Sequence, residues 1–289
     1  MNWFVIALCC AFLTACSDAV SKRIMWENDE WITGAVTLAV SALVLAPLLL
    51  FQELKPVSTD LVLLILISLP LEISSYYLFL SAIRMADLSL TLPLLAFTPV
   101  LTILTAAFLL GESISLAGGM GIALVTAGAY LLNGDLAHRS LFAPIQAIFS
   151  MPGCRRMLLV AFLWSLTSTL GKKGILLYGA IPYGVILVIC IAAALVWVSF
   201  LRSSTGLGSV NFNKNNMMLF LFGGLLMAGA QITHFVSLGL APVAYMISVK
   251  RLSLVFGVIL GRLLFKEENI SYRLIGASIM VLGVFFIYE

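Results

Sequence analysis

Residues 241–289 read APVAYMISVKRLSLVFGVILGRLLFKEENISYRLIGASIMVLGVFFIYE, two long apolar runs separated by the charged cluster Lys266-Glu267-Glu268. Each run is long enough for a membrane-crossing helix, which takes roughly 20 apolar residues. The first run also carries two adjacent cations, Lys250 and Arg251, about eight residues from its start, or roughly 12 Å along a helix axis. Cations at that depth are costly in lipid, so we treat them as candidates for function.

The whole chain shares this apolar character. Its 289 residues are 62% hydrophobic and 10% charged, with a mean hydropathy of +1.13. Soluble domains are about 25% charged, so this is the composition of an integral membrane protein. The net charge of +3 comes with scattered basic residues, which gives no basis for a nucleic-acid partner.

Motifs for enzyme chemistry are absent from the sequence. There is no Walker motif, HExxH or nucleotide-binding fingerprint. The five cysteines have neither disulfide nor metal-site spacing. We therefore expect no enzyme activity, no cofactor and no metal, which leaves an ion or substrate gradient as the energy source.

Ten apolar segments are long enough to cross a membrane, and they lack the alternation of a β-barrel. They cover residues 2–21, 31–51, 61–83, 88–110, 116–132, 157–178, 182–201, 217–238, 242–264 and 271–288. The polar connection 134–156 divides the chain into residues 1–133 and 157–289, with five helices each.

Basic residues gather in the odd-numbered connections. The opposite side has Lys55 as its only loop cation. This bias predicts cytoplasmic odd-numbered connections and both termini outside, in a multi-pass protein of a cell membrane, the bacterial inner membrane. Leu13-Thr14-Ala15-Cys16 has the form of a lipobox, but no basic residue precedes it, so we favour an uncleaved first helix.

The two halves are similar in sequence. A shift of 155 residues places Ala86 on Ala241, Glu112 on Glu267, and Gly121 and Gly128 on glycines 276 and 283. Because each half has an odd number of helices, the second copy must enter the membrane inverted. We expect an all-α membrane protein of ten transmembrane helices in two inverted five-helix repeats, with a central site between them, as in many secondary transporters.

The repeated unit resembles the EamA domain. The residues that carry this resemblance are Ala86, Pro99-Val100, Gly111-Glu112, Gly118, Gly119, Gly121 and Gly128. The resemblance covers nearly the whole chain and implies the ten-helix drug/metabolite transporter superfamily, whose substrates include amino acids, sugar phosphates and choline. The second copy departs from the pattern at Leu254, which replaces Pro99, and at Lys250-Arg251, which replace Leu95-Ala96.

Lys250 and Arg251 could bind an anionic substrate group, and a guanidinium suits bidentate contact with a carboxylate or phosphate. They could instead form an interior ion pair that fixes helix packing. Glu72, in the middle of segment 61–83, is the candidate counter-ion, proton carrier or cation ligand.

Three further residues complete the predicted substrate site. Tyr76 follows Glu72 by one helical turn, and Gln231 occupies the matching position in the second copy. His234 lies one turn from Gln231 and could titrate near neutral pH. We interpret Lys172 and Lys173, near the end of their helix, either as reaching the surface or as attracting anions to a cavity mouth.

The sequence thus predicts a secondary transporter that moves a small organic metabolite bearing an anionic group by alternating access, with proton antiport or exchange. Two alternatives stay open at this point. One is a flippase for a lipid-linked phosphate or sugar phosphate, and the other is a non-transporting membrane scaffold. The expected partners are a small-molecule substrate and the lipid bilayer, and the chain is expected to be a monomer or homodimer.

Overall fold

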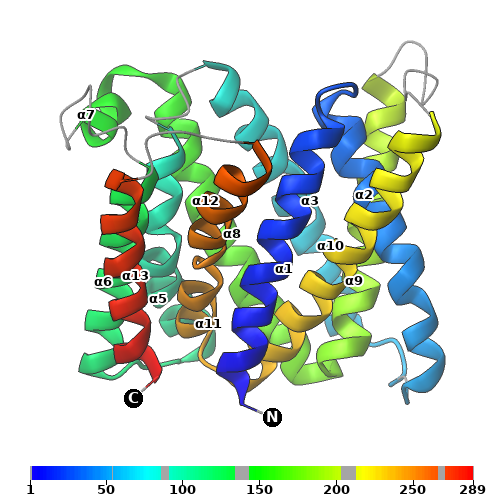
Figure 1. Cartoon of the computed structure of the whole chain (residues 1–289). Helices are drawn as coiled ribbons and strands as arrows, with labels where there is room; N and C mark the ends of the chain where they lie inside the picture. Colours follow the sequence, from blue (N-terminus) through cyan, green and yellow to red (C-terminus); the bar gives the residue numbers. More distant parts are fainter. Residues whose placement is uncertain are drawn as a thin grey trace. The chain divides into compact units, whose positions relative to one another are not determined.

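The fold was analysed in a computed structural model that describes residues 2–53, 55–85, 91–133, 143–202, 213–265 and 271–288 (Figure 1). These residues form helices and contain no strand. The elements in chain order are α1 (Trp3–Ile24), α2 (Glu30–Leu45), η1 (Ala46–Phe51), α3 (Thr59–Met85), η2 (Leu92–Phe97), α5 (Thr98–Leu110), α6 (Leu116–Asn133), α7 (Ala143–Ser150), α8 (Pro152–Tyr178), α9 (Ala180–Arg202), α10 (Lys214–Leu240), α11 (Val243–Lys250), α12 (Ser253–Phe265) and α13 (Ser271–Tyr288).

The helices confirm an all-helical protein of membrane type. Within the described residues, seven helical spans are long and apolar enough to cross a membrane, and two shorter apolar helices cover 116–132 and 273–288. The remaining long helix, α8, has 27 residues and carries the cations Arg155, Arg156, Lys172 and Lys173. Helix formation follows from the apolar composition, since a backbone in lipid must satisfy its polar groups internally.

Three predicted segments differ in detail from the structure. Segment 31–51 ends in the 3₁₀ helix η1, which begins beside Pro47, a residue without a backbone N–H. Segments 88–110 and 242–264 were expected to be continuous, but each contains an interruption, at η2 and at residues 251–252. The predicted polar connection 134–156 contains the helix α7 and the first turn of α8.

The element bounds repeat with the shift found in the sequence. Adding 155 to the bounds of α3, α5 and α6 reproduces those of α10, α12 and α13. The interruptions before α5 and α12 also correspond. Three residues used to align the repeats, Ala86, Lys266 and Glu267, lie outside the described residues.

The chain divides into two compact units. The first comprises Met1–Leu69 and Gly174–Leu240, and the second comprises Pro70–Lys173 and Ala241–Glu289. This division differs from the predicted repeats, because each unit takes helices from both halves of the sequence. The repeat boundaries at 133 and 157 stay a prediction.

In the first unit, α10 packs against α1, α2 and α9. Glycines on α10 allow this close approach, because a Cβ at Gly224 would lie 2.5 Å from the Cβ of Val40. Ile24, Ile32 and Phe220 form a buried cluster beneath one end of these helices. Beside it, the Glu27 carboxylate accepts a 2.9 Å hydrogen bond from Asn216.

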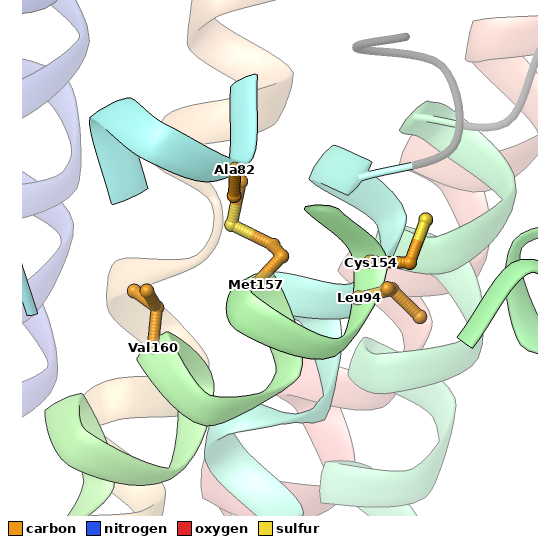
Figure 2. Packing of buried hydrophobic residues seen from close by; sticks show 5 residues of the cluster. All are labelled: Ala82, Leu94, Cys154, Met157 and Val160. Atoms are coloured by element: carbon orange, nitrogen blue, oxygen red, sulfur yellow. The ribbon is translucent and has the colours of Figure 1, made fainter. Parts of the chain in front are cut away.

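In the second unit, a buried cluster joins α3, η2 and α8. Ala82 and Leu94 contribute from α3 and η2, and Cys154, Met157 and Val160 from α8 (Figure 2). Figure 2 shows the Met157 side chain reaching to Ala82 and Cys154 lying beside Leu94. This cluster fixes the C-terminal part of α3 against the first turns of α8.

Helices α6 and α13 of the second unit lie side by side with their backbones in contact (Figure 1). A Cβ on Gly128 would lie 2.6 Å from the Gly276 carbonyl oxygen, and a Cβ on Gly283 would lie 2.6 Å from that of Gly121. Real Cβ atoms do not approach so closely. The glycines that aligned the two sequence repeats are therefore the contact points of these helices, a pattern common in membrane helix pairs.

We predict that Gly128→Val separates α6 from α13 and lowers the free energy of unfolding by roughly 1–3 kcal/mol, the cost of overpacking. Thermal unfolding of the purified protein in detergent measures this loss. Gly257→Ala on α12 is the matched control, because a Cβ there has nothing within 4 Å. Equal stability of the Gly128→Val variant and the wild type would contradict the proposed contact.

Candidate functional site

The six predicted site residues fall in both compact units. Four of them, Glu72, Tyr76, Lys250 and Arg251, belong to the second unit. Gln231 and His234 lie on α10 in the first unit. The geometry of the candidate site can therefore be described for the four residues of the second unit.

Lys250 and Arg251 lie at the interruption between α11 and α12, not inside a continuous helix. Lys250 is the last residue of α11 and Arg251 is its C-cap. The chain tightens there, because the N–H of Leu252 bonds to the carbonyl of Val249, 3.0 Å away and three residues back. No proline marks this turn, so the sequence did not reveal it. A helix C-terminus carries partial negative charge, which favours cations at this position.

Glu72 lies on α3, two residues after Pro70. Because proline has no N–H, it cannot donate to the carbonyl four residues earlier, and the helical hydrogen-bond ladder is interrupted beside Glu72. The chain passes from the first unit to the second at this same proline. The candidate carboxylate thus occupies a locally weakened point of a long helix.

Helix α8 runs antiparallel to the C-terminal part of α3. Ser81 accepts a hydrogen bond from Arg156 near the start of α8. Two turns further along α8, the ring of Trp164 lies 5.8 Å from that of Phe79. These paired contacts set the register of the two helices and bring the next turn of α8 toward Glu72.

That turn carries Thr167, whose side chain is buried. The Thr167 side chain and the charge of Lys250 both influence the Glu72 carboxyl. Three separate segments, α3, α8 and the end of α11, therefore contribute to the surroundings of Glu72. Pairing of Glu72 with Lys250 stays a prediction.

Arg251 is placed differently. Its side chain is partly buried, and its Nε atom is fully buried without a hydrogen-bond partner in the described part of the chain. A buried donor without a partner costs about 1–3 kcal/mol, and more when the group is charged. A carboxylate or phosphate oxygen would satisfy this donor.

The other three predicted residues are less informative. Tyr76 is half-buried, one turn after Glu72. Gln231 and His234 are also half-buried, and the His234 ring meets that of Phe235 edge-on at 5.3 Å. Their roles in a site stay predictions. The described residues contain no group of three His, Cys, Asp or Glu side chains that could hold a metal.

Thr167 was missed by the sequence analysis, although a signal was present. Ser165-Leu166-Thr167-Ser168-Thr169 has four hydroxyl residues in five, which is unusual in an apolar helix. Thr169 Oγ1 lies 2.9 Å from Thr105 Oγ1 on α5, so the same stretch also joins α8 to α5. Hydroxyl groups buried among membrane helices commonly bond across a helix interface in this way.

Lys172 does not reach the surface, which corrects one of the two interpretations of this residue. Its side chain is 6% exposed, and its Nζ donates a 3.0 Å hydrogen bond to the carbonyl of Ala241. Glu112 braces a helix end, because its carboxylate accepts a 2.8 Å hydrogen bond from the N–H of Val243.

The helices and their buried polar groups define a multi-pass membrane protein. The model of the EamA-like transporter family matches residues 1–134, which confirms over that part of the chain the resemblance seen in the sequence. A solved structure described as "Crystal structure of protein" matches with a TM-score of 0.76 and 15% identity, over 98% of this chain and 94% of that chain. That likeness shows the fold alone. No curated protein matched this chain.

We predict that Glu72 and Lys250 are energetically coupled. Lys250→Met removes the positive charge that acts on Glu72 and should lower the free energy of unfolding. The double variant with Glu72→Gln should lose less than the sum of the two single variants, by about 0.5–3 kcal/mol. Unfolding free energies in detergent give both values.

The matched control is the same cycle with Arg251→Met in place of Lys250→Met, which should be close to additive. A cycle with Arg251 that couples as strongly as the cycle with Lys250 would show that both cations share Glu72.

Proposed function

We propose that this protein is a secondary transporter of the EamA type that moves a small organic metabolite with an anionic group. The architecture we propose for it is ten membrane-crossing helices in two inverted five-helix repeats. The common shift of 155 residues in three pairs of helix bounds supports this arrangement. The EamA match to residues 1–134 supports transport as the activity. The charge bias of the connections supports the proposed orientation, and we propose the bacterial inner membrane as the location.

The difference between Lys250 and Arg251 carries the proposal for an anionic substrate. The charge of Lys250 acts on Glu72, whereas the Nε of Arg251 is buried without a hydrogen-bond partner among the described residues. A carboxylate or phosphate would supply that partner and balance the guanidinium charge. In this proposal Arg251 holds the substrate anion, and Lys250 is held in place by Glu72.

The same residues suggest how transport is coupled. Glu72 is the candidate proton carrier, because it is a carboxyl group inside a membrane-crossing helix, two residues after Pro70. Proton antiport and substrate exchange both require alternating access, in which the carboxylate or a second substrate neutralises the site on the return step. Tyr76, Gln231 and His234 remain further candidates for contact with the substrate.

We predict that anionic metabolites raise the apparent melting temperature of the purified wild-type protein, because a ligand that binds only the folded state stabilises it. A screen of amino acids, sugar phosphates, choline and organic anions measures this. Arg251→Gln should abolish the stabilisation by the anionic compounds that bind, together with their uptake into proteoliposomes.

Arg262→Gln is the control for this experiment, because Arg262 is an exposed arginine on the neighbouring helix α12. It should keep both binding and uptake. Wild-type binding and uptake by folded Arg251→Gln would refute the assignment of Arg251. Stabilisation by choline alone, or only by lipid-linked phosphates, would replace the substrate class proposed here.

A further inference from the structure

The start of α11 is held by side chains from two other helical regions of the second unit. Pro242, the N-cap of α11, offers no side-chain cap of its own. Glu112 supplies one from the α5–α6 connection, with its carboxylate 2.8 Å from the Val243 nitrogen. Gly111 makes this possible, since its φ of 67° ends α5 and turns the chain toward α11.

Lys172 on α8 completes this arrangement. Its Nζ lies 3.0 Å from the Ala241 carbonyl oxygen, and its charge interacts with that of Glu112. Ala241, just before α11, is thus bonded to Lys172, and Val243, the first residue of α11, is bonded to Glu112. The two side chains have opposite charges. Because Lys172 is buried, losing Glu112 would leave a cation without its counter-ion, which is costly.

A third contact lies one turn further along α11. The N–H of Ser115 donates a 3.1 Å hydrogen bond to the Tyr245 hydroxyl. The ring of Tyr245 occupies the space over Gly118, where a Cβ would collide with it. The first turn of α11 is therefore anchored to the region where α5 ends and α6 begins.

These contacts at the first turn of α11, made by Glu112, Lys172 and Tyr245 and called the anchor below, also affect the positions of Lys250 and Arg251. Helix α11 has eight residues, about 12 Å in length, and Lys250 is its last residue. The tightened turn at 251–252 separates α11 from α12. A two-turn helix moves as one body, so groups that hold its start also determine where Lys250 and Arg251 lie.

The anchor also lies beside two points where the chain passes between the compact units. These are Lys173–Gly174, next to Lys172, and Leu240–Ala241, directly before α11. Transition points of this kind are where hinge motions are absorbed in proteins that change conformation.

We propose that Glu112 and Lys172 form a latch that holds α11 in position and is released when α11 moves during transport. They are positioning residues for Lys250 and Arg251 and do not touch the substrate. The role of the α11 motion in transport rests on the proposed function. The motion of α11 itself needs no substrate, so the latch can be tested without one.

The test measures how accessible α11 becomes when the latch is broken. Ser248 is fully buried in the middle of α11, and cysteine is close to serine in size. Ser248→Cys is introduced into the full chain alone, with Glu112→Gln, and with Lys172→Met. N-ethylmaleimide labelling of each cysteine-containing peptide is then followed by mass spectrometry.

A native cysteine serves as the internal standard. Cys154 is buried in the second unit and reports its integrity, and labelling of the denatured protein gives full reactivity. With either latch variant, we expect labelling at position 248 to rise about tenfold while Cys154 stays protected, as for local opening without global unfolding. The double latch variant should label at least as fast as either single variant, because each side chain holds a different backbone atom near the start of α11.

Two results would overturn the latch. One is unchanged labelling at position 248 in both variants, and the other is a rise at position 248 matched by Cys154, which would make the pair a support of the whole unit. Glu27→Gln, which removes a carboxylate bonded to Asn216 in the first unit, is the control and should leave position 248 protected. Ala244→Cys, at another buried site on α11, is a second reporter should Ser248→Cys not fold.

Discussion

An ionised side chain among apolar helices must meet an opposite charge or polar groups, because neither lipid nor packed side chains can replace its hydration. This constraint applies at two places in the second unit. The Thr167 side chain and the charge of Lys250 both influence Glu72, and Lys172 meets Glu112 and the Ala241 carbonyl. Both arrangements use α8 and α11, so the polar face of α8 connects the two ends of α11.

Arg251 is the exception that gives the arrangement its proposed function. Its buried Nε has no hydrogen-bond partner among the described residues, beside a lysine whose charge acts on Glu72. A purely structural pair would leave no such group, since each buried polar atom without a partner reduces stability. A substrate anion that binds and dissociates would supply the missing partner of Arg251 Nε and offset this loss of stability.

The internal repeat accounts for where this site arose. Both copies interrupt the same helix, at η2 before α5 and at residues 251–252 before α12. The first copy has Pro99 and apolar residues there, and the second has Leu254 and two cations. In the first copy, proline explains the helix break. In the second copy, the break lies at the C-terminus of α11, where positive charge is favourable.

Apolar runs, their lengths and the repeated glycines were readable from the sequence, because lipid imposes helical structure locally and small residues mark close helix contacts. The family resemblance and the choice of Glu72, Lys250 and Arg251 as candidates came from the same source. The break after Lys250, the burial of Lys172 and the influence of Thr167 on Glu72 did not. They depend on residues far apart in the chain, such as 72, 167 and 250, and only the packing of α3, α8 and α11 decides which polar groups come near one another.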